Sequence, residues 1–583
     1  MKQLSYSIND ELAIRQMASE VADLPEYEQA TGRLLIVQEP AGNPELAQTN
    51  AALLGKLLPK THVISVSMIN LPGNTVMPKV GTVCTLLLFS SATLDVKAYD
   101  CSKMNVREAG REFAASIKAQ VDAKGVLCFT SCVTVSPAPF VEEVSLDYPE
   151  LPIFGTQAST VRLADDQSLI VVDGVAYGHG VVAIVLCGED LHILTDYNLG
   201  WRAVGRDFTV TEYEGNGRVS AIDENPAVSI YRKYLNVSSD SNFRDTICTF
   251  PLVEKNRDLL VARVPFGFTE DGTLQFSIAL PRGTRLRFAY SKPEYLMRTS
   301  IASANRIARF DPQALLLFAC WNRRVLLGDE RADREFDYYR RVCPSAIWAY
   351  GHCEILATSE GGGVLNNSIV AVAIREGEQS GCEPTLVSDP EFESRAASMS
   401  LADRLVTFLE ATTEELRSTI DELETLAERD TLTGVYNRRR MNELLRYELS
   451  KRRTESNLVL LMYDIDHFKR VNDTFGHDTG DMVLKSLTDC VQGMVRSADT
   501  LSRWGGEEFL CLLTHTNIEQ ARIVAERIRK NVEQTSFGQV GRVTISIGIT
   551  AALSTDTPDT LFARADKALY AAKHAGRNCT REA

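Results

Sequence analysis

Residues 503–513 decide the fold of the last part of the chain, and they read Arg503-Trp504-Gly505-Gly506-Glu507-Glu508-Phe509-Leu510-Cys511-Leu512-Leu513. A glycine pair between two strand-like runs is typical of a β-hairpin whose turn needs a positive φ angle. Two acidic residues follow the turn directly, before the apolar run begins. Carboxylates that open a buried strand need a partner, and a bound divalent cation is the usual one.

A second apolar run that ends in acidic residues lies upstream. The run Leu458–Tyr463 is followed by Asp464-Ile465-Asp466. If the two runs form neighbouring strands, Asp464 and Glu507 come together at one end of the sheet. This arrangement predicts Mg²⁺ held by carboxylates and by the phosphates of a nucleotide.

The composition indicates a protein of several domains. A chain of 583 residues is too long for one core, and about two to four domains are expected. The net charge of −15 argues against a nucleic-acid polymer or an anionic membrane as partner. Thirteen scattered cysteines, of which Cys128 and Cys132 are the closest pair, predict reduced thiols. No apolar leader and no run of roughly 20 apolar residues is present, so we expect a cytoplasmic protein without a membrane span.

The Gly-Gly-Glu-Glu-Phe stretch and its surroundings resemble the GGDEF domain of diguanylate cyclases. The resemblance begins at the turn Asp430–Arg439 and covers residues 430–583, where several motifs follow in order. It implies a central sheet similar to the palm of nucleotidyl cyclases and polymerases. It also implies a nucleotidyltransferase that condenses two GTP into cyclic di-GMP and two pyrophosphates, in bacterial second-messenger signalling of the biofilm and motility type.

The resemblance further implies a role for each motif residue. Mg²⁺ or Mn²⁺ is expected on Asp464, the Ile465 carbonyl and Glu507, and Glu507 is also the expected base for the ribose 3′-hydroxyl. Glu508 completes the acidic pair, whereas Asp466 is expected to cap the following helix rather than to bind metal. The expected substrate-binding residues are Phe468, Lys469, Asn472, Asp481, Gly505, Gly506, Lys573 and Arg577.

Asn472 and Asp481 match the positions that bind the guanine base in the family, and the physics of Asp481 agrees. A carboxylate accepts hydrogen bonds from N1–H and the exocyclic amine of guanine, whereas adenine presents an acceptor at N1. Asp481 would therefore select GTP over ATP. A helix that begins near His467 would direct free backbone N–H groups at the triphosphate.

Arg496-Ser497-Ala498-Asp499 precedes Gly505 with five residues between them. This is the RxxD spacing of the family's inhibitory site, and it implies allosteric inhibition by bound cyclic di-GMP. Arg527, on the expected helix Ile518–Val532, is the implied partner from a second face. Away from this register, an RxxD motif is usually a surface ion pair.

The N-terminal part alternates strand-like and helical runs, which predicts an α/β fold. The stretches Leu199–Gly205, Phe250–Leu252 and Gly351–Ile355 resemble the FIST domain, a bacterial sensory module, over residues 30–376. Ala319 and Cys353 depart from the family pattern. The resemblance implies a small ligand, and a haem held by His352 or His179 is one form of it; the alternative is that both are ordinary hydrogen-bonded histidines.

Between the two parts, composition predicts a linker and then a helix. Leu409, Leu416 and Leu423 recur every seven residues, with Leu405, Ile420 and Leu426 on or near the same seam, which predicts a short two-stranded coiled coil and a homodimer through this helix and the cyclase faces. A single helix packed on its own domain is the alternative. The expected divisions are 1–29 lead-in, 30–227 and 228–376 sensory halves, 377–399 linker, 400–429 signalling helix and 430–583 cyclase.

Two functions remain open at this point, and the fold class for both is mixed α/β (α+β). The first is an active diguanylate cyclase regulated by a ligand of the sensory part and by its product. The second is a catalytically silent receptor for GTP or cyclic di-GMP. Loss of Asp464, Glu507 or the glycine pair would favour the receptor, and none of them is lost.

Overall fold

The computed structural model describes residues 1–583 apart from 41–42, 69–81, 132–134, 160–167, 238–242, 244–245, 248, 391–400, 451–456 and 497. The side chains of 401–403, 417, 420–424 and 426 also lie outside the described part. The chain forms two compact units, Met1–Ala411 and Thr412–Ala583. Among the described helices, none is both long and apolar enough to cross a lipid bilayer.

The described residues of the first unit form four β-sheets. The first sheet has the order β1 (Lys2–Ile8), β4 (Thr82–Phe89), β2 (Gly32–Pro40), β3 (His62–Met68), β8 (Ile170–Val172), β9 (Val175–Tyr177). The second has the order β23 (Gly361–Leu365), β22 (Glu354–Thr358), β7 (Ile153–Gln157), β6 (Ala123–Thr130), β10 (Gly180–Cys187), β5 (Thr93–Asp100).

The remaining two sheets of this unit come mainly from later parts of the chain. The third has the order β11 (Leu191–Asn198), β24 (Ile369–Glu376), β20 (Ala314–Cys320), β21 (Ile347–Gly351). The fourth has the order β16 (Leu259–Arg263), β15 (Leu252–Asn256), β19 (Arg285–Tyr290), β12 (Arg202–Gly215), β13 (Arg218–Ile222), β18 (Leu274–Phe276), β17 (Pro265–Phe268), and β14 (Asn225–Pro226) pairs with β13.

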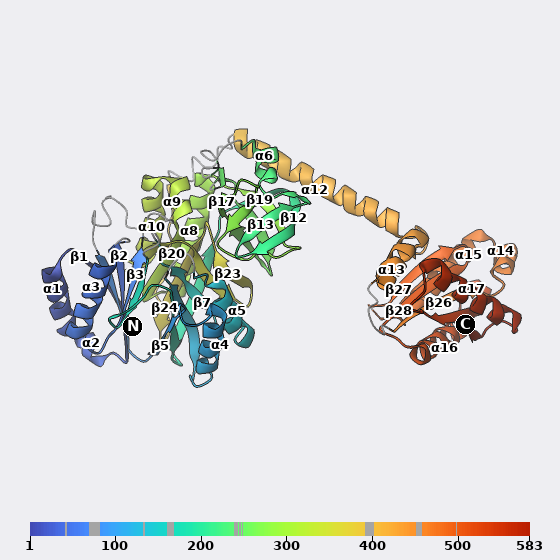
Figure 1. Cartoon of the computed structure of the whole chain (residues 1–583), viewed down its shortest axis with the longest axis horizontal. Coiled ribbons are helices and arrows are strands. Elements are labelled where there is room, and N and C mark those ends of the chain that lie inside the picture. Colours follow the sequence, from blue (N-terminus) through green and yellow to red (C-terminus); the bar gives the residue numbers. More distant parts are fainter. Residues whose placement is uncertain are drawn as a thin grey trace. The chain divides into compact units, whose positions relative to one another are not determined.

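Helices cover the sheets of the first unit (Figure 1), and these are α1 (Glu11–Ala22), α2 (Pro25–Gln29), α3 (Pro44–Leu57), α4 (Val106–Ile117), α5 (Ala138–Asp147), α6 (Ser229–Leu235), α8 (Pro293–Phe310), α9 (Trp321–Leu327) and α10 (Asp329–Val342). The residues of β20 alternate between two cores. Leu315 and Leu317 pack with α8 and α10, whereas Leu316 and Phe318 join a core shared by the first three sheets. Both faces of the strand are buried, which explains its continuous apolar sequence.

The two expected halves of the sensory part share their sheets. β22 and β23 extend the sheet of β7, and β11 pairs with β24, so strands of 30–227 and 228–376 lie side by side. Residues 1–29, expected as a polar lead-in, contain β1, which pairs with β4 from Lys2 to Ile8. The two expected halves therefore share sheets within one compact unit.

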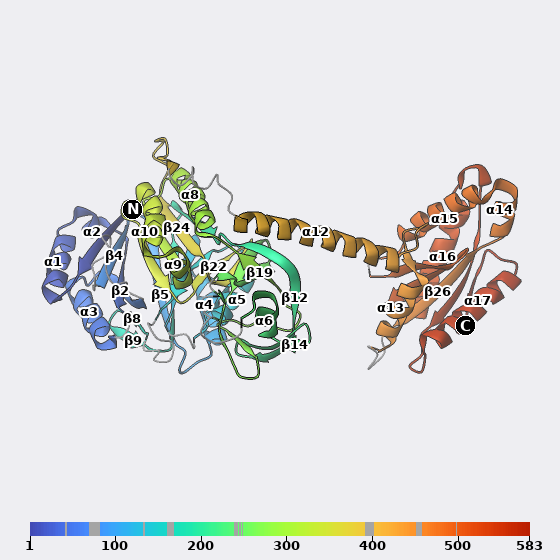
Figure 2. The same cartoon turned by 90° about the horizontal axis from the view of Figure 1, so that it is seen from above.

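The second unit is a three-layer α/β domain. Its sheet has the order β25 (Tyr436–Asn437), β27 (Thr500–Gly505), β28 (Glu508–Thr514), β26 (Leu458–Ile465), β29 (Ile545–Ala551), β30 (Thr580–Glu582). Figure 2 shows the sheet between two pairs of helices: α15 (His477–Gln492) and α16 (Ile518–Gln534) on one face, α13 (Arg438–Ser450) and α17 (Pro558–His574) on the other. α14 (Phe468–Phe475) follows β26. The mixed α/β fold expected for this part is confirmed.

The expected signalling helix is α12 (Leu401–Glu428). Leu405, Leu409 and Leu416 on the expected seam are each more than half exposed, at 54%, 55% and 64%. The side chains of Leu423, Ile420 and Leu426 lie outside the described part. The helix is as expected, and the coiled coil stays a prediction.

Candidate active site

The hairpin expected at the glycine pair is formed by β27 and β28. Gly505 pairs with Glu508 across the turn, and Gly506 has a φ angle of +50°, which glycine adopts at little cost. A Cβ atom built on Gly505 or Gly506 would meet no atom within 4 Å. The turn therefore leaves its backbone open to an approaching molecule.

β26 and β28 are neighbouring strands, as the sequence predicted, and the acidic residue that their register pairs with Asp464 is Glu508, the neighbour of the expected Glu507. The two strands are antiparallel. Asp464 is only 4% exposed, whereas Glu507 and Glu508 are half-buried at the open end of the hairpin. The Lys573 Nζ, near the end of α17, lies 2.7 Å from Asp464 Oδ2.

The electrostatics of this cluster favour a cation. Burial raises the pKa of the Asp464 carboxyl above its ordinary value, and the Lys573 ammonium acts in the opposite direction. Burial also raises the pKa of both Glu507 and Glu508, and the negative charge of Asp464 adds to the effect in each. Carboxylates that repel one another in a partly buried place are stabilised by a positive charge between them.

The donor set fits Mg²⁺ or Mn²⁺ shared with a nucleotide. No three His, Cys, Asp or Glu side chains in the described part of the chain converge closely enough to hold a metal ion by themselves. Asp464 and Glu507 would supply two carboxylates, and the Ile465 carbonyl follows Asp464 at the end of β26. Mg²⁺ commonly binds through one or two carboxylates and completes its octahedron with substrate phosphates and water.

Asp466 does not cap the following helix, so that expectation is wrong. The N-cap of α14 is His467, with φ +58° and no side-chain cap. Asp466 instead accepts hydrogen bonds from Thr544 Oγ1 and Ser546 Oγ, both at 2.7 Å, and from the Asn578 N–H at 3.0 Å. These contacts use both of its oxygens and fasten the segment after α17 beside the acidic cluster.

Asn472 and Asp481, expected at the guanine base, lie on the adjoining helices α14 and α15. The Asn472 Oδ1 is buried without a hydrogen-bond partner, whereas Asp481 is exposed. A Cβ atom on Gly480 would lie 1.9 Å from Asn472 Oδ1 and 3.2 Å from the ring of Phe468. A glycine at 480 therefore lets the Asn472 amide take its position.

The three basic side chains expected to bind phosphate differ in how far they are buried. Lys573 is half-buried against Asp464, whereas Lys469 and Arg577 are exposed. Burial raises the pKa of Asp464, and the positive charge of Arg577 opposes this rise to a small extent, so its guanidinium lies near the cluster. Lys469 is in the first turn of α14, directly after the strand that carries Asp464.

A contact that the sequence did not predict joins the entry turn to the hairpin. Arg503 Nε donates to the Gly506 carbonyl at 2.9 Å, and its Nη1 lies 3.1 Å from Asp430 Oδ1. Asp430 also accepts from the Thr433 N–H at 3.0 Å, and Gly434 has φ +73°. One side chain, Arg503, thus ties the turn that follows α12 to the β27–β28 hairpin.

The three residues expected at an inhibitory site come to one surface region. The Arg496 N–H donates to Asp499 Oδ2 at 3.0 Å, so the two ends of the RxxD motif form one turn. Arg527 Nη2, on α16, donates to the Met494 carbonyl at 2.7 Å, two residues before Arg496. The Arg496 side chain is exposed.

The two histidines considered for haem lie in different places of the first unit. His179 is exposed between β9 and β10. His352 is half-buried between β21 and β22, and its N–H donates to the Gln157 carbonyl at 3.2 Å. Cys132, of the closest cysteine pair, lies outside the described residues, and Cys128 is a buried free thiol.

Three family models and several known proteins match parts of this chain. The family models described as FIST N domain, FIST C domain, and Diguanylate cyclase, GGDEF domain match residues 35–225, 227–352 and 427–579. The protein Diguanylate cyclase DgcP of Pseudomonas aeruginosa is 44% identical over 153 residues, which are 26% of this chain and 23% of that protein. Response regulator PleD of Caulobacter vibrioides is 42% identical over 174 residues, 28% of this chain and 38% of that protein.

Diguanylate cyclase A of Treponema denticola is 46% identical over 125 residues, 21% of this chain and 34% of that protein. The chain thus spans between 23% and 38% of the length of these three relatives. The matched GGDEF residues include the hairpin, the acidic cluster and Lys573. The chain therefore carries a GGDEF domain of the diguanylate cyclase family in residues 427–579, preceded by FIST N and FIST C domains.

Proposed function

We propose that the GGDEF domain condenses two molecules of GTP into cyclic di-GMP and releases two pyrophosphates. One observation carries the proposal: Asp464 lies opposite Glu508 at the open end of a hairpin with two bare glycines, with Lys573 at 2.7 Å from Asp464. Carboxylates, a cation and accessible backbone are the groups that phosphoryl transfer requires.

Each 3′-hydroxyl oxygen attacks the α-phosphorus of the other GTP, and the bond from that phosphorus to the pyrophosphate oxygen breaks. Glu507 takes the hydroxyl proton, and Glu508 contributes to the negative field beside it. Asp464, Glu507 and the Ile465 carbonyl are the groups that would hold Mg²⁺ or Mn²⁺. The chemistry that the bound ion supplies is a lower pKa of the hydroxyl and compensation of charge on the phosphoryl oxygens.

The remaining residues bind and orient GTP. Asp481 accepts hydrogen bonds at the guanine edge, and Asn472 binds there through its amide. The buried unpartnered Asn472 oxygen supports this role, because such an atom is costly without a partner. Phe468, whose ring lies close to Gly480, contributes to the same place. The charges of the phosphates are balanced by Lys469, Lys573 and Arg577, and Gly505 and Gly506 let the backbone approach the ribose.

Two GTP molecules need two domains, so the active form is a homodimer. The exposed leucines of α12 support a contact between two copies of that helix, together with the cyclase faces. The FIST part binds a small ligand, of which haem on His352 or His179 is one form, and thereby sets how the two cyclase domains meet. Cyclic di-GMP at Arg496, Asp499 and Arg527 inhibits the enzyme, and the protein acts in the cytoplasm.

The test is product analysis with GTP and ATP as parallel substrates. Purified full-length protein is incubated with Mg²⁺ and either nucleotide, and products are separated by chromatography and identified by mass. We expect cyclic di-GMP and two equivalents of pyrophosphate from GTP, and no cyclic dinucleotide from ATP. GTP binding without turnover in dimeric protein would favour the silent receptor instead.

A further inference from the structure

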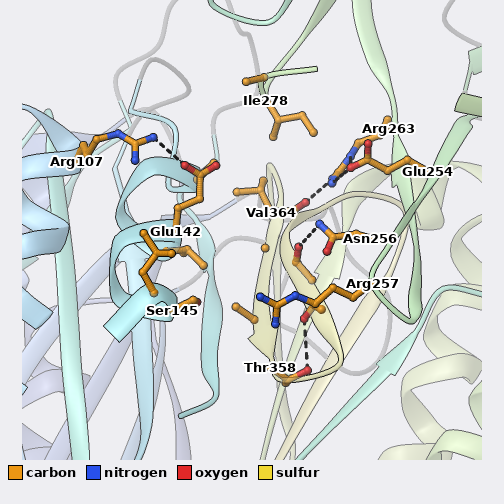
Figure 3. A pocket seen from close by; sticks show the side chains of 18 residues that line it. Arg107, Glu142, Ser145, Glu254, Asn256, Arg257, Arg263, Ile278, Thr358 and Val364 are labelled. Atoms are coloured by element: carbon orange, nitrogen blue, oxygen red, sulfur yellow. Dashed lines mark hydrogen bonds and ion pairs between the residues drawn. The ribbon is translucent and has the colours of Figure 1, made fainter. Parts of the chain in front are cut away.

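A cavity of about 440 Å³ lies in the first unit, between α5 on one side and the β15–β16 hairpin with β22 and β23 on the other (Figure 3). It is therefore lined from both expected halves of the sensory part. Ala138, Val141, Ile278 and Val364 give it an apolar lining. Cavities of this size and mixed polarity are typical of sites for small organic molecules.

One wall of the cavity is bare backbone. Gly361, Gly362 and Gly363 in β23 have φ angles of +127°, +116° and +119°, which side-chain-bearing residues rarely adopt. A Cβ atom on Gly363 would meet nothing within 4 Å. The Gly362 carbonyl accepts from Asn256 Nδ2 at 3.0 Å. The Val364 carbonyl accepts from Arg263 Nη1 at 2.6 Å. These acceptors of the wall are already used.

Most charges around the cavity are paired with one another. Arg263, almost fully buried, forms an ion pair with Glu254. Arg107 on the opposite wall lies 2.8 Å from Glu142 and 2.6 Å from Glu143. The positive charges of Arg263 and Arg107 are therefore largely neutralised by these glutamates and are not available to a ligand.

Arg257 differs from these residues. Figure 3 shows its side chain extending from the β15–β16 hairpin toward the cavity. Its Nη1 donates to the Ser359 carbonyl at 3.3 Å, and it forms no ion pair with a carboxylate in the described residues. A guanidinium has five N–H donors, so most of its hydrogen-bonding capacity remains for another acceptor.

The backbone of Arg257 supports a functional role. It occupies the two-residue turn between Asn256 and Leu259 with a φ angle of +51°. Glycine, asparagine and aspartate usually occupy such hairpin positions, because a larger side chain is strained there. Strained positions of this kind often serve a site rather than the fold.

We propose that this cavity binds a small amphipathic monocarboxylate, with its carboxylate on Arg257 and its apolar part against Val141, Ile278 and Val364. Of the arginines that line the cavity, Arg107 and Arg263 are paired with glutamates, which leaves the Arg257 guanidinium for one carboxylate. The planar guanidinium matches a carboxylate in bidentate geometry. The cavity would thus be the place where the FIST part binds its ligand, and a monocarboxylate would be the chemical class of that ligand. Any regulatory effect of this ligand rests on the proposed sensory function.

The experiment is calorimetric titration of the full-length protein with sodium hexanoate and sodium benzoate at constant ionic strength. The neutral amides hexanamide and benzamide are matched probes of the same shape. We expect saturable binding of at least one carboxylate at one site per chain, and at least tenfold weaker binding of its amide. No GTP is present, so failure of the proposed cyclase activity would not affect this result.

Three variants locate the site. Arg257→Gln should weaken carboxylate binding at least tenfold, and Ser145→Trp, which fills the cavity from the half-buried surface of α5, should abolish it. Arg282→Gln, an exposed arginine on another turn, should bind as the unmodified protein does. Circular dichroism verifies that each variant folds. The proposal is overturned if neither carboxylate binds, if inorganic phosphate binds in their place, or if Arg257→Gln and Ser145→Trp leave binding unchanged.

Discussion

The Lys573 Nζ lies 2.7 Å from the Asp464 Oδ2, so a cation of the protein itself neutralises the carboxylate proposed to hold the metal. Asp464 is buried in the sheet, whereas the Lys573 side chain is 31% exposed and reaches it from α17. When no nucleotide is bound, Lys573, the proposed phosphate contact, therefore competes with a metal ion for Asp464, the proposed metal ligand.

Lys573→Met removes this competition and should separate two effects. We expect cyclase activity to fall at least tenfold, since a phosphate contact is lost, and the affinity for Mn²⁺ without nucleotide to rise, since Asp464 loses its internal cation. Mn²⁺ titration followed by electron paramagnetic resonance measures the second effect. Lys567→Met, an exposed lysine on the same helix, is the control. Unchanged Mn²⁺ affinity in Lys573→Met would show that the ion pair does not compete with metal.

Gly480→Ala should weaken GTP binding. Its Cβ atom would lie 1.9 Å from Asn472 Oδ1 and would displace the amide that we place at the guanine edge. Loss of one such contact costs about 1–3 kcal/mol, so KM for GTP should rise roughly tenfold or more. Steady-state kinetics measure it. Gly493→Ala, where the nearest atom is 3.6 Å away, should keep the original KM. Equal KM values for both variants would remove Asn472 from the guanine site.

Arg496→Ala should relieve product inhibition and leave the initial rate unchanged. The Arg496 side chain is exposed, and its backbone N–H rather than its guanidinium holds Asp499. The turn should therefore survive the substitution, whereas a contact to bound product would be lost. Progress curves with added cyclic di-GMP provide the measurement, and Arg522→Ala on α16 is the control. Inhibition of Arg496→Ala at the original product concentration would place the inhibitory site elsewhere.

Glu354 should make the stability of the first unit depend on pH. Burial raises the pKa of this carboxyl to about 8 from an ordinary value of 4.5. The folded state therefore keeps a proton that the unfolded state releases. The resulting stabilisation is full below pH 4.5 and falls by about 1.4 kcal/mol per pH unit until the pH passes about 8.

Glu354→Gln carries no titrating proton, so its stability relative to the unmodified protein should increase between pH 5 and about pH 8. Urea unfolding at several pH values measures this difference. Glu360→Gln, an exposed residue of the same hairpin, should show no such trend. A difference between Glu354→Gln and the unmodified protein that does not change with pH would mean that Glu354 is ionised in the fold.

The sequence predicted the acidic cluster well because its signals are local. The run Leu458–Tyr463 is apolar at every position, since both faces of β26 are buried, and Asp464 stands out directly after it. The glycine pair marks the turn of the hairpin in the same way. Asp464 lies near the end of one strand and Glu508 begins its antiparallel neighbour. Few registers of the two strands other than the observed one would keep both apolar runs paired, and this register places Asp464 opposite Glu508.

Contacts between distant segments could not be predicted in this way. Asp466 resembles a helix cap in its local sequence, but its partners Thr544, Ser546 and Asn578 lie about 80 residues or more away. Likewise, no local pattern indicates that β22 and β23 complete the sheet of β7. The strand β1 could not be predicted from its sequence, because only some of its residues face the core and the others are polar.

Cyclic di-GMP formation from GTP and Mg²⁺ by the full-length protein, beside Glu507→Gln and the control Glu443→Gln on α13, tests the proposed cyclase activity most directly. We predict product from the unmodified protein and from Glu443→Gln, and at least a hundredfold less from Glu507→Gln, because an amide neither takes the 3′-hydroxyl proton nor neutralises a metal ion. Equal product from Glu507→Gln would contradict the role of the acidic cluster, and no product from dimeric unmodified protein would contradict the cyclase itself.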